Sequence, residues 1–266
     1  MSTSSKIILI GEHSVVYGKK AIAIPIKNLS LSVSLIDEYI FESEHVKYIK
    51  SLIEENFDVP KKYIKIESNI PKSAGMGSSA SLAIEIARAY NVDENFVVLN
   101  AEKKKHGNPS GIDSTVILNE KAIIYQKNEK IEFLSKLNAF IVIANTREYG
   151  NTKKAIEIVK EKNRPDLIDD LGKITELAIV YYKNKSLVNL GKTFELAQNI
   201  LKQLGVSSEK IEEIVELSKP YSLGTKLSGG GLGGVTISLC NGLDNARELR
   251  KVLRKNKIKD VFIVRI

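Results

Sequence analysis

The sequence predicts an α+β protein, because strand-like and helical patterns occupy different parts of the chain. Short apolar runs typical of strands are concentrated before residue 146, whereas apolar residues recur at helical spacing through most of residues 153–218. Such segregation is typical of α+β folds rather than of alternating βαβ units. The 266 residues, 43% of them hydrophobic, suffice for two domains, which we expect at residues 1–146 and 147–266.

Each expected element rests on its own run of apolar residues. Brief apolar runs predict strands, and longer stretches with apolar residues at helical spacing predict helices. The strands expected in the first part are 6–10, 21–36, 64–67, 115–118, 122–125 and 139–145. The expected helices are 44–57, 79–90, 166–182, 186–204 and 208–218. Two final apolar runs predict strands at 235–239 and 261–265.

The segment PKSAGMGSSAS, residues 71–81, gathers small residues immediately before an expected helix. Glycines such as Gly75 and Gly77 allow backbone N–H groups to converge on an anion, and a helix N-terminus adds roughly half a positive charge. A polyphosphate is therefore one natural ligand. An ordinary helix start capped by Ser78 or Ser79 is the alternative, and the segment alone does not decide between them. It lacks the Lys-Ser or Lys-Thr pair that ends the common P-loop.

Three other segments carry unusual polar residues or glycines. Near the N-terminus, the apolar run 7–10 leads into GEHSVVYGK, so Glu12 and His13 follow a predicted strand. In the middle, AEKKKHGNPSGIDSTV sets Asp113 among glycine and proline, which predicts an irregular loop, and such loops often carry function. The third segment, KLSGGGLGG at 226–234, precedes another apolar run.

Together these four segments resemble the GHMP kinase family, which includes galactokinases, homoserine kinases, mevalonate kinases and phosphomevalonate kinases. GEHSVVYGK resembles the family's first motif, PKSAGMGSSAS its second motif and KLSGGGLGG its third. The matching segments follow the family's order from Lys6 to Gly234 and so span nearly the whole chain. GEH followed by VVYGK, and HGNPSGID, resemble the mevalonate kinases most closely. The resemblance implies a two-domain GHMP kinase-like fold: an N-terminal ribosomal protein S5 domain 2-like domain, a C-terminal ferredoxin-like domain, and ATP between them.

The resemblance also implies the parts of a phosphoryl-transfer site. Asp113 would accept the proton of the acceptor hydroxyl, and Lys6 would lie beside it. Ser79 and Glu102 would hold Mg²⁺, and Glu102 precedes Asp113 by eleven residues, as in mevalonate kinases. From the residues alone, other roles stay open: Asp113 could cap a turn, and Lys6 and Glu102 could be ordinary solvated surface residues. The phosphates of ATP would lie on Lys72, Ser73, Ala74, Gly75, Met76, Gly77, Ser78 and Ser79.

The residues implied for the acceptor side are Glu12, His13, Ser110, Thr152 and Gly230. His13 would bond substrate oxygens, but a structural histidine that orients the Gly11 turn is an equal alternative. Thr152 would contact substrate, yet its place after Asn151 equally predicts a helix N-cap. One departure from the family is Leu232, where many relatives have glycine. If this position needs a positive φ, leucine costs about 1 kcal/mol or more.

These implications predict an Mg²⁺-dependent enzyme that transfers the γ-phosphoryl group of ATP to the 5-hydroxyl of mevalonate in isoprenoid biosynthesis. Relatives that act on phosphomevalonate, homoserine or other alcohols share the first two motifs, so another acceptor stays open. A catalytically inactive member that binds a metabolite also stays open, although the joint presence of Lys6, Ser79, Glu102 and Asp113 argues against it.

Composition narrows the partners and the location. A net charge of +8 suits anionic ligands such as ATP with a carboxylate substrate. The lysines are scattered and no recognised nucleic-acid motif occurs, so we expect no nucleic-acid partner. Cys240 is the only cysteine in the sequence, which excludes an intrachain disulfide. We find no signal peptide and no apolar run near the roughly 20 residues of a membrane span, so we expect a soluble, cytoplasmic protein with no membrane partner; a homodimer stays open.

Overall fold

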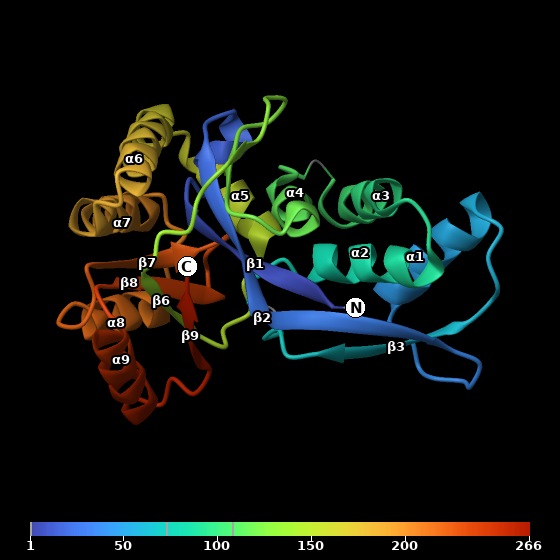
Figure 1. Cartoon of the computed structure of the whole chain (residues 1–266). Coiled ribbons are helices and arrows are strands. Elements are labelled where there is room, and N and C mark those ends of the chain that lie inside the picture. Colours follow the sequence, from blue (N-terminus) through green and yellow to red (C-terminus); the bar gives the residue numbers. More distant parts are fainter. Residues whose placement is uncertain (1, 73, 108) are drawn as a thin grey trace. The chain divides into compact units, whose positions relative to one another are not determined.

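The computed structural model of the chain, shown in Figure 1, confirms the α+β prediction; it describes residues 2–72, 74–107 and 109–266, with only the backbone of residue 106. Its strands are β1 (Thr3–Ile10), β2 (Ala21–Ile36), β3 (Tyr63–Ser68), β4 (Ile123–Tyr125), β5 (Glu132–Phe133), β6 (Phe140–Asn145), β7 (Gly224–Ser228), β8 (Val235–Cys240) and β9 (Val261–Arg265). Its helices are α1 (Glu44–Asn56), α2 (Ser78–Tyr90), α3 (Glu94–His106), α4 (Ile112–Asn119), α5 (Thr152–Lys162), α6 (Pro165–Lys183), α7 (Leu187–Gln203), α8 (Glu209–Ser218) and α9 (Leu243–Lys255). A short 3₁₀ helix, η1 (Ser14–Tyr17), follows β1.

The chain forms two compact units that are interleaved in sequence. The first consists of Met1–Lys6, Pro25–Ile70 and Gly77–Glu120, and the second of Ile7–Ile24, Pro71–Met76 and Lys121–Ile266. Strands β1 and β2 therefore contribute residues to both units. The division predicted at residue 146 stays a prediction. Within the described part of the chain, every helix is too short or too polar to cross a membrane.

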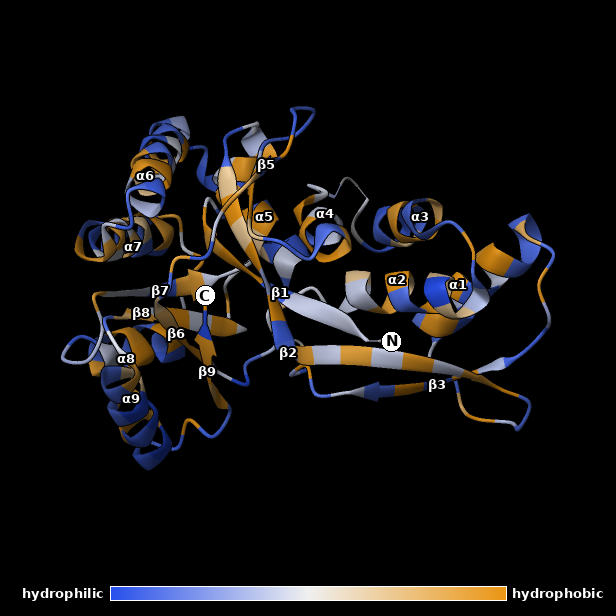
Figure 2. Cartoon of the chain, in the orientation of Figure 1, coloured by the Kyte–Doolittle hydropathy of each residue, from blue (hydrophilic) through white to orange (hydrophobic). Residues whose placement is uncertain are grey.

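In the first unit, helices α1 to α4 accompany an antiparallel β2–β3 ladder. The ladder runs from Leu31 opposite Ser68 to Ile36 opposite Tyr63. Figure 2 shows hydrophobic and polar bands alternating along β2, the period-two pattern typical of a strand. Helix α2 packs against α1, α3 and α4 because apolar residues cover much of its circumference. Its buried apolar residues are Ala80, Ala83, Ile84, Ile86, Ala87 and Tyr90.

The structure corrects two predictions for the segment around Asp113. The strand predicted at 115–118 is wrong and the predicted loop is shorter than expected, because α3 extends to His106 and α4 begins at Ile112, which leaves residues 107 and 109–111 of the described chain outside these helices. Gly107 and Gly111 both have positive φ, and they end one helix and begin the next. The β-branched run at 115–117 favours a strand locally, but the packing of α4 against α2 overrides this preference.

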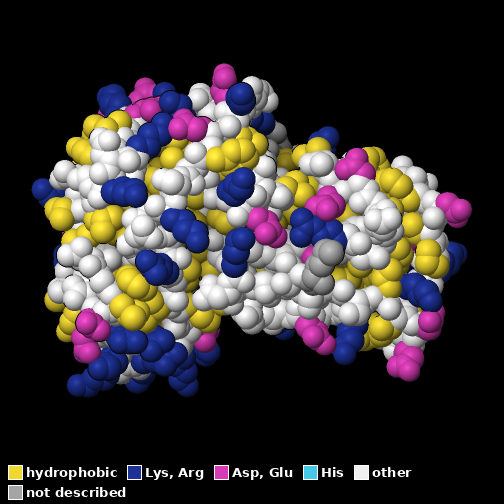
Figure 3. Space-filling view, in the orientation of Figure 1, with side chains coloured by type: hydrophobic (Ala, Val, Ile, Leu, Met, Phe, Trp, Pro, Cys, Tyr) yellow, Lys and Arg dark blue, Asp and Glu magenta, His cyan; other side chains and the backbone are white. Residues whose placement is uncertain are grey.

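In the second unit, β7, β8, β6 and β9 form an antiparallel sheet in that order. Helices α8 and α9 pack on this sheet, and their shared core includes Val142, Ile214, Cys240 and Leu249. The sequence analysis missed α9, although its buried residues recur at helical spacing. Figure 3 shows a concentration of Lys and Arg over α9, whose outward residues include Arg247, Arg250, Lys251, Arg254 and Lys255.

Helix α7 and strand β7 approach each other at backbone distance. A Cβ atom added to Gly224 would lie 2.0 Å from the carbonyl oxygen of Gly191. A Cβ atom added to Gly191 would lie 2.2 Å from the carbonyl oxygen of Leu223. The two glycines therefore let the helix rest directly on the strand that leads into the third glycine-rich segment.

Candidate active site

Lys6 and Asp113 form an ion pair within the first unit. Lys6 comes from β1 and Asp113 from the first turn of α4, and Nζ lies 2.8 Å from Oδ1. The Lys6 side chain is 2% exposed, whereas that of Asp113 is 31% exposed. The alternative of a surface lysine is therefore wrong. A buried cation requires a paired anion, and here the anion keeps an open side that a ligand can reach.

Gly77 makes room for the buried Lys6 side chain. Its φ is 75°, and an added Cβ would lie 3.0 Å from both Lys6 Cγ and Ile117 Cδ1. Any larger residue would thus be strained in its backbone and would also press on the lysine stem. The second motif therefore shapes the surroundings of the Lys6–Asp113 pair.

Glu102 is a buried carboxylate of α3 near the same pair. It is 5% exposed, and its Oε2 accepts a hydrogen bond of 2.9 Å from Ser114 Oγ. Burial, followed by the charge of Asp113, raises the pKa of Glu102 to about 7, although Ser114 and Lys6 act in the opposite direction. The alternative of a solvated surface glutamate is therefore wrong. Lys6 and Lys105 already place positive charge near this carboxylate, and a bound cation would add to it.

The N-terminus of α2 has no side-chain cap among the described residues. Gly77 is the N-cap residue, in the left-handed conformation, and helix α2 begins at Ser78. Ser79 Oγ lies 2.9 Å from His45 Nε2 instead of bonding the first turn. The alternative of a serine cap is therefore wrong within the described chain. The N–H groups of the first turn form the kind of donor set that binds an anion.

The earlier part of the glycine-rich loop, Pro71–Met76, belongs to the second unit and lies against the third segment. A Cβ added to Gly234 would lie 3.1 Å from Ala74 O, and one added to Gly75 would lie 3.8 Å from Ser228 O. Lys72 is exposed and Met76 is buried. The phosphate-binding residue predicted at Ser73 lies outside the described residues.

Glu12 and His13 form a buried junction with the third segment in the second unit. Glu12, 2% exposed, pairs with Lys226, which is fully buried, through a short contact between Oε1 and Nζ. His13 Nε2 lies 3.0 Å from Gly230 O, so this nitrogen carries the proton and donates it. Burial chiefly lowers the pKa of His13 to about 4, so the ring is neutral at pH 7. This side-chain contact joins His13 to the third segment and not to the Gly11 turn, so both predicted roles of His13 stay predictions.

The third segment also touches the predicted acceptor residue Thr152. A Cβ added to Gly230 would lie 2.9 Å from Thr152 Oγ1, so the glycine permits this approach. Thr152 is the first residue of α5, and the cap is Asn151, whose side chain accepts from Lys154 N, so the N-cap alternative for Thr152 is wrong. Leu232 has a φ of 56°, the strained conformation considered from the sequence.

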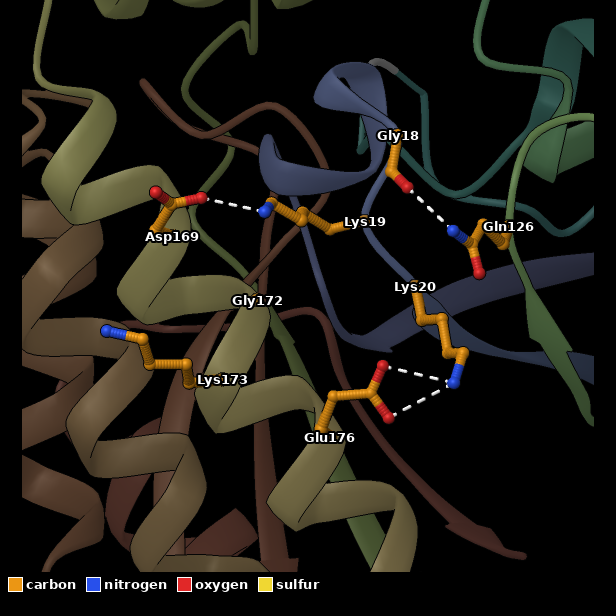
Figure 4. Close-up of a pocket in the computed structure, with 8 residues that line it drawn as sticks. All are labelled: Gly18, Lys19, Lys20, Gln126, Asp169, Gly172, Lys173 and Glu176. Atoms are coloured by element: carbon orange, nitrogen blue, oxygen red, sulfur yellow. Dashed lines mark hydrogen bonds and ion pairs between the residues drawn. The ribbon is translucent and has the colours of Figure 1, made fainter.

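Figure 4 shows a cavity of about 420 Å³ that contains none of the predicted site residues. Two ion pairs cross it: Lys19 Nζ lies 2.7 Å from Asp169 Oδ1, and Lys20 Nζ lies 3.1 Å from Glu176 Oε1. Both join the turn after η1 to helix α6. The cavity therefore belongs to the support of the first motif rather than to a ligand site.

Sequence reasoning missed several residues that the structure brings to the motifs. Lys226 opens the third segment but carried no predicted role, and Ser114 and His45 lie outside every predicted site set. A lysine at the start of a glycine-rich segment was the available signal for Lys226. Ser110, by contrast, was predicted and lies half-buried between α3 and α4.

Comparisons with known proteins identify a family for both parts of the chain. The model of the GHMP kinases N terminal domain matches residues 44–120, and the model of the GHMP kinases C terminal domain matches residues 178–259. A mevalonate kinase of Methanocaldococcus jannaschii is 30% identical, with 97% of each chain covered. A mevalonate kinase of Thermococcus gammatolerans is 32% identical over 90% of this chain and 88% of its own.

Solved structures share the fold. The crystal structure of L. major mevalonate kinase in complex with R-mevalonate has a TM-score of 0.84 at 24% identity and covers 99% of this chain and 95% of its own. The structure of the Methanococcus jannaschii mevalonate kinase has a TM-score of 0.80 at 26% identity, covering 99% and 96%. A Streptococcus pneumoniae phosphomevalonate kinase reaches 0.83 at 14% identity, covering 100% and 98%, which bears on the fold alone.

Proposed function

Because the chain belongs to the GHMP kinase family, we propose that it transfers the γ-phosphoryl group of ATP to the 5-hydroxyl of mevalonate in isoprenoid biosynthesis. The observation that carries this proposal is the buried Lys6 held against Asp113, within electrostatic reach of Glu102. Phosphoryl transfer needs positioned charges more than covalent chemistry, and this cluster supplies them. Identity of about 30% with several mevalonate kinases over most of the chain supports the choice of acceptor.

Asp113 acts as the base in this proposal. The acceptor hydroxyl oxygen attacks the γ-phosphorus, the bond from that phosphorus to the β–γ bridging oxygen breaks, ADP leaves, and the hydroxyl proton passes to the Asp113 carboxylate. The open side of Asp113 gives the hydroxyl access, while Lys6 fixes the other side of the carboxylate. The Lys6 ammonium also offsets negative charge on the transferring oxygens.

Mg²⁺ fits the residues present. Glu102 is a buried carboxylate with a raised pKa, and Ser79 offers a hydroxyl, both hard oxygen ligands. The described residues contain no group of three or more His, Cys, Asp or Glu side chains, which suits an ion that takes few protein ligands and keeps waters. When bound, the ion would neutralise phosphate charge; the protein's part is to place the Glu102 carboxylate and the Ser79 hydroxyl.

The loop Lys72–Ser79 binds the ATP phosphates in this proposal. The first turn of α2, which has no side-chain cap among the described residues, and the left-handed Gly77 before it support this role, because the N-terminus of a helix favours an anion. Lys72 is exposed, so its charge is accessible to the nucleotide. The proposed phosphate-binding set also includes Ser73, Ala74, Met76 and Ser78.

The acceptor residues remain Glu12, His13, Ser110, Thr152 and Gly230. We propose that Glu12 serves this side through its pair with Lys226, since its carboxylate is buried. His13 offers Nδ1 as an acceptor for a substrate hydroxyl, because Nε2 donates to Gly230 O. Thr152 offers an exposed hydroxyl beside Gly230.

We further propose that the enzyme works in the cytoplasm, in lipid metabolism, without nucleic-acid or membrane partners. A homodimer stays a proposal, as do the two domain limits at residue 146. The match with phosphomevalonate kinase structures, at 14% identity, leaves acceptor choice to experiment.

The test is ADP release with Mg²⁺ and ATP against mevalonate, 5-phosphomevalonate, homoserine and galactose, with the Asp113→Asn variant in parallel. Turnover with mevalonate alone, lost in the variant, is the expected result. Turnover with another acceptor would overturn the substrate assignment. If ATP binds but no ADP is released with any of the four acceptors, the result would instead favour a catalytically inactive family member that binds a metabolite.

A further inference from the structure

The hydroxyl of Ser79 has a partner that no motif contains. Its Oγ lies 2.9 Å from Nε2 of His45, 34 residues earlier in the chain. Ser79 is the second residue of α2, and His45 is the second residue of α1. Both helices belong to the first unit and pack against each other. The contact therefore joins the first turns of two neighbouring helices.

Neither side chain is needed to cap its own helix. Gly77 is the N-cap of α2, and Ser43 caps α1 by accepting a hydrogen bond of 3.4 Å from Val46 N. A serine near a helix start ordinarily bonds the backbone of that turn. Here Ser79 bonds an imidazole instead, so its direction is set by α1.

The direction of this hydrogen bond decides what Ser79 can do. A serine hydroxyl has one proton and two lone pairs, and a neutral imidazole has one donor and one acceptor nitrogen. If Nε2 accepts the Ser79 proton, both lone pairs of Oγ are left for a cation. If Nε2 donates, its hydrogen occupies one lone pair of Oγ and so competes with the cation for that oxygen.

We propose that His45 is a positioning residue whose Nε2 accepts a hydrogen bond from the Ser79 hydroxyl. This hydrogen bond keeps both lone pairs of Ser79 Oγ directed to the divalent cation of the ATP complex. This inference rests on the proposed function, in which Ser79 is a cation ligand. Partners of metal ligands commonly change metal affinity by about 10–100-fold when they are removed. His45 would act on the cation only through Ser79.

The experiment uses the full chain with Mn²⁺ as the metal probe. Mn²⁺ affinity in the presence of ADP is measured by electron paramagnetic resonance for wild type, His45→Phe, His45→Gln and Ser79→Ala. ADP affinity in EDTA and the thermal midpoint are measured for the same proteins. Lys47→Ala, an exposed change on α1, is the matched control and leaves all three values unchanged.

We expect His45→Phe to weaken Mn²⁺ binding about tenfold while ADP affinity in EDTA and the thermal midpoint change little. His45→Gln should recover most of this loss, because its amide oxygen can accept the Ser79 proton. In Ser79→Ala, adding His45→Phe should weaken Mn²⁺ binding no further, since the two residues act as one unit.

Unchanged Mn²⁺ affinity in His45→Phe, together with a loss in Ser79→Ala, would overturn the role of His45 and leave the proposed function standing. A loss of thermal stability and of metal-free ADP affinity in both His45 variants would also overturn it, because a simple clasp between α1 and α2 predicts that pattern. If Ser79→Ala itself keeps full Mn²⁺ affinity, the metal assignment of Ser79 fails, and the inference fails with it.

Discussion

Two regions of this protein each contain a buried lysine paired with a carboxylate, and they differ in what else surrounds the pair. In the first, Lys6 is paired with an Asp113 that stays 31% exposed, and the neighbouring Glu102 has a raised pKa. In the second, Lys226 and Glu12 are 0% and 2% exposed, and His13 already donates to Gly230 O. The first cluster is incomplete, because Asp113 keeps an exposed side beside a carboxylate whose pKa is raised, whereas the second is complete within the protein.

This difference in exposure predicts different tasks for motif residues of the same chemical type. The incomplete cluster is suited to a ligand that brings cations and a hydroxyl. The complete cluster joins the first motif to the third and so preserves the shape of the second unit. Substitutions should therefore act chiefly on catalysis in the first region, whereas in the second region their main effect should be on stability, beside any effect on acceptor binding through Glu12 and His13.

The largest expected effect is on catalysis. Asp113→Asn should lower kcat about a thousandfold or more, because the amide cannot take the hydroxyl proton. The buried Lys6 ammonium loses its anion, so the thermal midpoint should also fall, but by less than for a fully buried pair because Asp113 is 31% exposed. Steady-state kinetics and thermal unfolding of the same preparation check both parts. Asp170→Asn, at an exposed position on α6, is the control; equal loss of activity in both would contradict the assignment.

In the second region, the largest expected effect is a loss of folding stability. Lys226→Met leaves the Glu12 carboxylate buried without its partner and should destabilise the fold by about 3–5 kcal/mol, measured by urea unfolding. The double variant Lys226→Met with Glu12→Gln should regain part of this loss, because it buries no unpaired charge. A fully stable Lys226→Met enzyme with impaired kcat would show that this pair belongs to the chemistry.

The two regions should also respond oppositely to pH. For Glu102, the folded pKa of about 7 lies above the ordinary value of 4.5, so the folded protein binds more protons in that interval and its stability falls as pH rises through it. For His13, the folded pKa of about 4 lies below 6.5, so stability falls as pH drops from 6.5 towards 4.

Glu102→Gln should remove the first response and leave the second. In the metal-free protein near pH 8 it should raise stability by on the order of 1–3 kcal/mol, while activity falls because the amide is a poorer cation ligand. Urea unfolding across this pH range in EDTA is the measurement. An unchanged pH profile in the variant would show that Glu102 is solvated in solution.

The smallest effect concerns Leu232 in the third segment. Leu232→Gly should be more stable than Leu232→Ala by about 1 kcal/mol, because only glycine relieves the left-handed backbone that the φ of 56° records. Thermal midpoints of the two variants decide this comparison. Alanine at least as stable as glycine would mean that the segment adopts another backbone conformation.

Residues near one another in sequence were predicted best. The spacing of Glu102 and Asp113 and the glycine before α2 are local signals, and the structure brings both carboxylates into one electrostatic cluster. The strand predicted at 115–118 failed because packing against α2 outweighs the local preference of β-branched residues.

Partners distant in sequence could not be predicted from the chain alone. Glu12 and Lys226 are 214 residues apart, and His45 and Ser79 are 34 apart, so no spacing rule connects them. The exposure of Asp113 likewise depends on how α4 packs, which one segment cannot show. The site's residue types were therefore predictable, whereas the division between chemistry and support required the fold.

The contact between Gly191 and Gly224 limits how this sequence can diverge. The atoms that a new Cβ would meet are backbone atoms, at 2.0 Å and 2.2 Å, so no change of a neighbouring side chain can compensate for a substitution at either position. Most core positions can drift in pairs, one residue growing as its neighbour shrinks. Such compensation is not possible here, so both glycines should be retained in any descendant in which α7 packs on β7.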